Sequence, residues 1–197
     1  MAWSLIFCLI MAAHSSTRAL EELRKHLATP EPPELGPGPR SNVEALPKLQ
    51  AQLDNVLGKT ALPPNAQSLV RSLIFLWHDH LDAAHRIAQE IEDADGSYVH
   101  GIMHRREPDY GNAKYWFRRV GKHACFAELS KRTAAILRGK AETGLASKLI
   151  SGGGWDPYAF IDACEQAAGT SATAPPNQWL RAIQAIEFEI LLEKFCR

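Results

Sequence analysis

The sequence has no pair of cysteines at C-x-x-C spacing, no apolar run of the roughly 20 residues that a membrane-spanning helix needs, and no net charge. Its four cysteines are scattered, which argues against a thiolate zinc centre and against a disulfide framework. The 22 basic residues equal the 22 acidic ones, so no overall positive field attracts a polyanion. We therefore expect no integral membrane span, and nucleic acid is disfavoured as a partner.

Signature motifs of several enzyme classes are also missing. There is no G-x-S-x-G element and no G-x-G-x-x-G fingerprint, which disfavours serine acyl transfer and hydride transfer. The run Ser151–Gly154 is rich in glycine but lacks the lysine that completes a P-loop. Any chemistry must therefore come from another arrangement of side chains.

Length and composition favour one globular domain. The chain has 197 residues, and domains hold roughly 150. Hydrophobic residues make up 46% and charged residues 22%, as in ordinary globular proteins. The segment Pro30–Pro39 is rich in proline and glycine and is typical of an extended linker. This pattern predicts an N-terminal appendage over residues 1–40, with a short helix and the linker, and an α-helical domain over residues 41–197.

The N-terminus bears on the compartment. Residues 2–13 form an apolar run of the length of a signal-peptide core. No basic residue precedes it, and Met11 could itself start a soluble chain, so a cytoplasmic location is favoured. Export after cleavage of a leader near residues 13–19 stays open.

Apolar residues recur at three- and four-residue steps through most of the chain, and no strand-like alternation stands out. The pattern predicts an all-α, single-domain helical bundle in which a long helix is followed by an antiparallel hairpin partner. The expected helices cover residues 43–57, 63–95, 97–107, 112–120, 126–140, 156–168 and 177–195.

Eight histidines are the unusual feature of the composition. On a helical wheel, His78, Asp82 and His85 share one narrow face of the expected long helix. His100, His104 and Glu107 share one face of the next helix, at i, i+4 and i+7. In a hairpin that turns near residues 95–96 these two faces meet, so the candidate ligands converge.

Imidazole nitrogens and carboxylate oxygens suit zinc, iron or manganese, and two histidines one turn apart offer two ligands to one ion. We therefore expect a divalent metal to be held by His78, His85, His100 and His104. A solvated helix face or a metal-free hydrogen-bonded cluster is the competing interpretation.

The segment from Arg105 to Lys122 carries six basic residues and two acidic ones. Arginine forks bind carboxylates and phosphates bidentately, so this segment predicts a pocket for a small anionic ligand. The candidate substrate-binding residues are Arg105, Arg106, Arg118, Arg119 and Tyr115. Pairing with nearby acids, or with the C-terminal dipole of a helix, is the alternative.

Three segments carry a resemblance to known proteins: YVHGIMHRREPDYGNAKYWFRRVGKH at Tyr98–His123, LWHDHLDAAHRIAQ before it, and WDPYAF after it. Over roughly residues 70–165 the chain resembles a family of uncharacterised soluble helical proteins with an HRREPDYxNAKYWFRRVGxH-type signature. Ala124 stands where that signature has proline. The resemblance implies a functional region but no reaction.

These observations predict a metal-dependent hydrolase acting on a small anionic substrate, with Glu107 or Asp82 as general base. The alternative is a non-catalytic helical binding module in which the histidine and arginine cluster is structural and the basic face meets an acidic partner.

Overall fold

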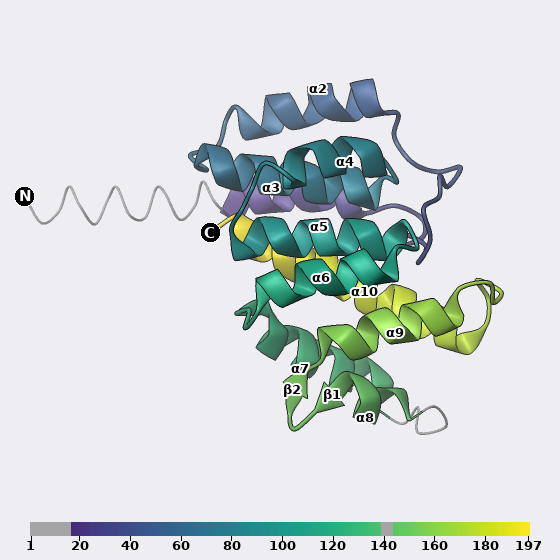
Figure 1. Cartoon of the computed structure of the whole chain (residues 1–197). Coiled ribbons are helices and arrows are strands. Elements are labelled where there is room, and N and C mark those ends of the chain that lie inside the picture. The colour runs from purple at the N-terminus through teal and green to yellow at the C-terminus, as the bar shows by residue number, and fades with distance from the viewer. Residues whose placement is uncertain (1–16, 139–143) are drawn as a thin grey trace, which may run out of the picture.

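Helices account for most of the residues that the computed structural model describes, which are 17–138 and 144–197 (Figure 1). The all-α fold class predicted from the sequence is confirmed. Residues 17–24 are helical and lead into the 3-10 helix η1 (Lys25–Leu27). The remaining elements are α2 (Leu46–Leu57), α3 (Pro64–Trp77), α4 (Leu81–Ala88), α5 (Ala94–Arg106), α6 (Tyr110–Val120), α7 (Cys125–Leu137), α8 (Leu145–Leu149), β1 (Ile150–Ser151), β2 (Gly154–Trp155), α9 (Pro157–Ala167) and α10 (Pro175–Phe195).

Helix α5 occupies the middle of the fold. Every residue from Gly96 to Arg106 is buried, because α3, α4 and α6 pack around it and α10 passes behind it in Figure 1. Helix α10 contributes Phe188, Leu191 and Leu192 to the same core. Polar side chains on α5 are therefore held in a largely water-free environment.

The expected long helix over residues 63–95 is two helices, and this prediction was wrong. Helix α3 ends at Trp77, and Asp79 adopts a left-handed conformation with φ of 64°. The backbone N–H groups of Asp79 and His80 donate to the carbonyls of Leu76 and Phe75, which is a Schellman ending with aspartate in place of the usual glycine. The chain then turns before α4 begins.

Helix α5 also begins earlier than expected. Asp93 caps it by accepting a hydrogen bond of 2.8 Å from the backbone N–H of Gly96, so the predicted turn at residues 95–97 lies within the first helical turn. A side chain at Gly96 would meet the carbonyl oxygen of Ile91, so the close approach of the α4–α5 connection requires glycine there. The antiparallel hairpin is formed by the short α4 and by α5.

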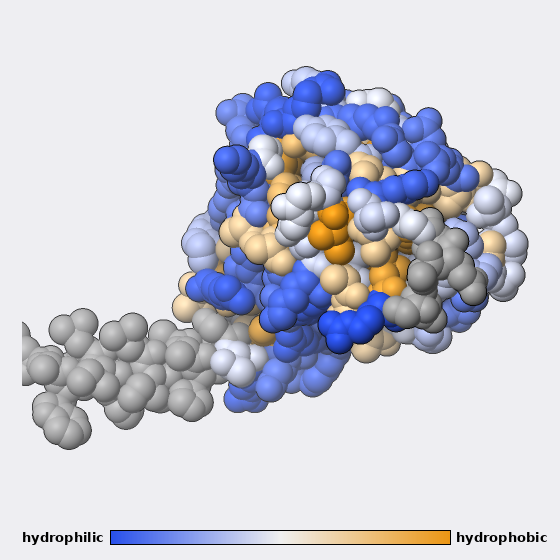
Figure 2. All heavy atoms as spheres, turned by 90° about the horizontal axis from the view of Figure 1, so that it is seen from below, coloured by the Kyte–Doolittle hydropathy of each residue, from blue (hydrophilic) through white to orange (hydrophobic). Residues whose placement is uncertain are grey.

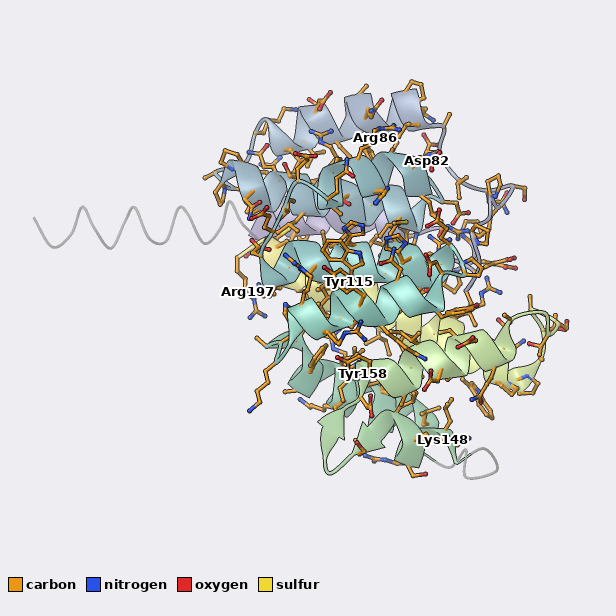
Figure 3. The ribbon with its side chains drawn as sticks, in the orientation of Figure 1. Asp82, Arg86, Tyr115, Lys148, Tyr158 and Arg197 are labelled. Carbon is orange, nitrogen blue, oxygen red and sulfur yellow. The ribbon has the colours of Figure 1, made fainter. Side chains whose placement is uncertain are left out.

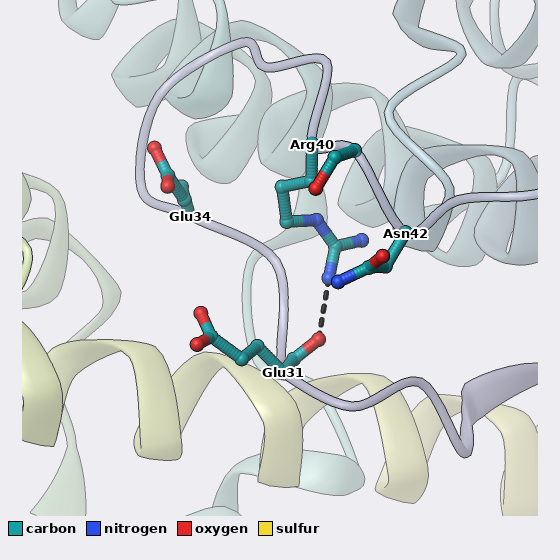
Figure 4. A pocket seen from close by; sticks show the side chains of 5 residues that line it. Glu31, Glu34, Arg40 and Asn42 are labelled. Atoms are coloured by element: carbon teal, nitrogen blue, oxygen red, sulfur yellow. Dashed lines mark hydrogen bonds between the residues drawn. The ribbon is translucent and has the colours of Figure 1, made fainter.

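The N-terminal segment was predicted to be an appendage, but the part that the structure describes packs on the helical domain. Leu23, Leu27 and Leu35 are buried in the common core. Arg181 donates to the carbonyl of Pro32, and Gln184 donates to those of Pro33 and Glu34. These hydrogen bonds attach the proline-rich segment to α10. Figure 4 shows the small pocket in this segment, where Arg40 donates to the carbonyl of Glu31. The candidate leader lies outside the described residues.

Within residues 17–138 and 144–197, no helix has both the length and the apolar character required to cross a membrane. In the view of Figure 2, apolar side chains reach the surface in separate spots between hydrophilic ones. The large hydrophobic side chains that are exposed in the described residues are Tyr115 and Tyr158. Cys125, Cys164 and Cys196 are buried free thiols, in agreement with the expected lack of a disulfide framework.

Gly101 sets the distance between α5 and α6. A Cβ atom at this position would lie 2.8 Å from the ring of Phe117, which is closer than a side-chain contact allows. We expect Gly101→Ala to lower the free energy of unfolding by about 1–3 kcal/mol, because overpacking outweighs the gain in helix propensity. The measurement is urea unfolding. Gly111→Ala is the matched control, because its Cβ would meet only Asp109 at 3.9 Å; an equal change in both variants would contradict this account.

Candidate metal centre

Three of the four predicted metal ligands converge between α4 and α5. His85 lies on α4, and His100 and His104 lie one turn apart on α5. Their candidate ligand atoms all lie within 4.8 Å of one another. Nitrogen ligands of a tetrahedral zinc ion at about 2.0–2.1 Å are roughly 3.3 Å apart, so closing the site requires side-chain shifts of roughly 1.5 Å. The three histidines could hold a metal ion.

The ring of His100 lies at the centre of this cluster. Its side chain is buried, and neither ring nitrogen has a hydrogen-bond partner. Its ring is 4.6 Å from that of His85 and 4.9 Å from that of His104, measured between centroids. A buried polar group without a partner is costly, so this ring is an unusual feature of the core.

His104 is positioned by two neighbours. The carboxylate of Glu107 lies 3.2 Å from Nδ1, and the side chain of Asn112 donates a hydrogen bond of 3.1 Å to Nε2. Both ring nitrogens of His104 thus have a partner, and a metal on Nε2 would replace the amide of Asn112. Glu107 orients the ring of His104, and its carboxylate is half-exposed.

Helix α6 forms the third wall. The ring of Trp116 stacks on His100 at a centroid distance of 3.8 Å and an angle of 18°. The guanidinium of Arg119 lies over Trp116, 5.2 Å from the ring centroid. Asn112, Trp116 and Arg119 follow one another at four- and three-residue steps, so one stripe of α6 faces the histidines. This spacing is the sequence signal by which Asn112 and the stacking role of Trp116 could have been identified.

His78 does not belong to the cluster, which corrects the fourth predicted ligand. The helix break at Asp79 interrupts the helical period between α3 and α4, so His78 and His85 no longer share a face. Nε2 of His78 is 2.8 Å from the carbonyl oxygen of His26, and its Nδ1 accepts a hydrogen bond from the backbone N–H of Glu44. With both nitrogens occupied, this ring joins the N-terminal segment to α3.

Arg105 and Arg106 were expected to bind substrate, but both guanidinium groups are buried in internal ion pairs. Arg105 pairs with Glu187 of α10 at 2.5 Å, and Arg106 pairs with Asp79 at 2.6 Å. Asp79 also receives the guanidinium of Arg40, and these two cations lower the pKa of its carboxyl against the opposing effect of burial. The two arginines hold helices together and are not free to take a ligand.

The other predicted substrate-binding residues lie on the surface of α6. Arg118 lies over the ring of Tyr115, at 5.8 Å, and Tyr115 is exposed (Figure 3). Of the four predicted arginines, Arg119 is the one whose position next to Trp116 borders the histidine cluster.

Both predicted general bases line one groove, of about 430 Å³. Asp82 and Glu107 share it with Arg86, which was not among the predicted site residues. Asp82 and Arg86 are exposed on α4 (Figure 3). Arg86 could have been predicted from the sequence, because it directly follows His85 and lies one helical turn after Asp82.

Burial lowers the pKa of His100 to about 3, with smaller contributions from the neighbouring His104 and His85. In the unfolded chain this imidazole gains its proton near pH 6.5, whereas in the folded chain it does so only near pH 3. The unfolded state therefore binds more protons between these values, and the stability of the metal-free protein falls as the pH is lowered through this range.

We expect this loss to reach about 1.4 kcal/mol per pH unit for one histidine, measured by urea unfolding in a chelator between about pH 6.5 and pH 5. Asp79 and Asp95, whose pKa values are lowered, stay ionised in this window. His100→Gln should give a shallower slope. An unchanged slope in that variant would show that His100 is not the group responsible.

No protein-family model, curated protein or solved structure matches the chain. The resemblance to the family with the HRREPDYxNAKYWFRRVGxH-type signature therefore remains a prediction.

Proposed function

We propose that the chain binds one divalent transition-metal ion through His85, His100 and His104, and uses a metal-bound water to hydrolyse a small anionic substrate. The observation that carries this proposal is the convergence of three imidazoles around a buried ring without hydrogen-bond partners. Zinc, iron and manganese all accept such ligands. Three protein ligands leave a fourth position of a tetrahedral ion open for water, as in catalytic zinc sites.

The chemistry follows from the groups around the site. A bound zinc ion lowers the pKa of its water to about 7, which supplies a nucleophile at neutral pH. Glu107 is the better placed general base, because its carboxylate is 3.2 Å from the ring of His104 and half-exposed. Arg119 borders the site through Trp116, and Arg86 lines the groove that includes Glu107, so both provide positive charge for an anionic group. Asp82 is then left for substrate recognition.

A panel of small anionic esters, including p-nitrophenyl phosphate, tests this function with the zinc-loaded chain. Hydrolysis should require the metal, and Glu107→Gln should lower kcat by about 10²–10⁴-fold, which is the usual contribution of a general base. Glu90→Gln, at an exposed site just after the C-terminal end of α4, is the control and should keep the activity. Zinc binding without any metal-dependent hydrolysis would overturn the catalytic part of the proposal.

The second candidate is a helical binding module in which the cluster has only a structural role. The burial of Arg105 and Arg106 in internal ion pairs favours it, because the same segment then serves to fasten helices. Folding and stability that do not change when zinc is added or removed would support this alternative.

A further inference from the structure

The groove next to the histidine cluster combines apolar walls with separated charges. Pro37, Leu46, Leu81 and Ala83 supply the walls. Its volume of about 430 Å³ falls in the range of small-molecule sites. Glu107 lines this groove and also contacts His104, so this residue connects the groove to the histidine cluster.

Of the charges that line the groove, those of Asp82 and Arg86 are not used by the fold. Asp79 is neutralised by Arg40 and Arg106. Asp82 and Arg86 stand four residues apart on α4, a spacing at which opposite charges usually pair. Within the residues that the structure describes, neither of them makes an ion pair. An unpaired carboxylate and an unpaired guanidinium therefore face the same groove.

From these observations we infer that the groove binds a zwitterionic molecule of dipeptide size with an apolar side chain. The inference rests on the proposed metal-dependent hydrolysis and narrows it: the anionic group of the substrate is a peptide carboxylate, and the bond cleaved is an amide. Arg86 binds the carboxylate, Asp82 binds the ammonium group, and the apolar walls take the side chain.

The length of the ligand follows from helix geometry. Residues four apart on a helix are separated by about 6 Å along its axis. Two residues of an extended peptide span roughly 7 Å, whereas the ammonium and carboxylate of a single amino acid lie on one carbon atom. The spacing of Asp82 and Arg86 thus fits a dipeptide better than a free amino acid.

Cleavage of such a ligand would consume one water molecule. A metal held by His85, His100 and His104 would supply the hydroxide that adds to the amide carbon, and the C–N bond would break. The proton that Glu107 takes from the water goes to the leaving nitrogen, so the products are two amino acids and no oxidant or reductant is needed.

Calorimetric titration of the full chain with glycyl-leucine tests the inference. Its N-acetylated and C-terminally amidated forms are the comparison ligands, since each lacks one charge. Glycyl-leucine should bind at least tenfold more tightly than either. Arg86→Gln should remove the preference over the amide, and Asp82→Asn should remove the preference over the acetylated form. Lys148→Gln, at the other end of the molecule in Figure 3, should change neither.

Each titration is made on zinc-loaded and on chelated protein, with the zinc content measured in the same samples. Equal affinity for all three ligands on zinc-loaded protein would overturn the inference and leave the metal site standing. Charge-selective binding by a chain that takes up no zinc would support the groove and overturn the proposed metal-dependent function. The two failures are therefore distinguishable.

Discussion

Protein produced without a histidine tag should take up about one equivalent of zinc, and the double variant His85→Ala, His104→Ala should take up none under the same conditions. Loss of a residue that merely orients a metal ligand costs about 10–100-fold in affinity. Removing two of three direct ligands should therefore lower zinc affinity by more than about 100-fold. Elemental analysis and competition with a fluorescent chelator measure the two quantities.

The pH dependence of this uptake gives a second signature. A histidine must be neutral to bind a metal, and burial keeps the pKa values of His100 and His104 below the ordinary value of 6.5. Competition from protons on these two rings should therefore be weak at neutral pH. Zinc affinity should decline on acidification at lower pH than it does for an exposed histidine pair.

The control for the double variant is His26→Ala, which removes a half-buried histidine outside the cluster. This variant should keep its zinc. Far-UV circular dichroism shows whether each variant is folded, so a loss of zinc in a folded double variant can be assigned to the ligands. Wild-type protein without zinc uptake, or a double variant with undiminished affinity, would contradict the site.

The helical period was enough to predict the fold class and the pairing of His85 with His100 and His104. His100 and His104 lie at i and i+4 in α5, and His85 lies in α4, the helix that precedes α5 along the chain. Such local relations depend on backbone geometry that every helix shares. The convergence of His85, His100 and His104 was therefore predictable from the sequence.

The helix break at Asp79 was not predictable in the same way. A left-handed residue at a helix end is usually glycine, and an aspartate there gives no comparable signal. It is accompanied here by ion pairs to Arg40 and Arg106, which lie 39 and 27 residues away. The exclusion of His78 and the burial of Arg106 both follow from this long-range contact, which periodicity does not encode.

The environment of Arg105 leads to the second large expected effect. Its side chain and that of Glu187 are each 1% exposed, and its guanidinium also lies 4.4 Å over the ring of Phe160. Arg105→Ala would leave the carboxylate of Glu187 buried without a partner. Breaking a buried pair in this way costs about 3–5 kcal/mol, so we expect the free energy of unfolding to fall by that amount in urea titrations.

Two further variants separate this effect from the substrate-binding role expected from the sequence. Arg105→Met combined with Glu187→Leu removes both charges and should recover most of the stability, because apolar residues of similar volume replace a buried pair at little cost. Lys48→Ala breaks the exposed pair with Glu44 and should change stability by less than about 1 kcal/mol.

If Arg105→Ala left stability unchanged but weakened ligand binding, Arg105 would instead belong to the binding site. A large loss of stability that the double replacement relieves would identify Arg105 and Glu187 as the buried link between α5 and α10.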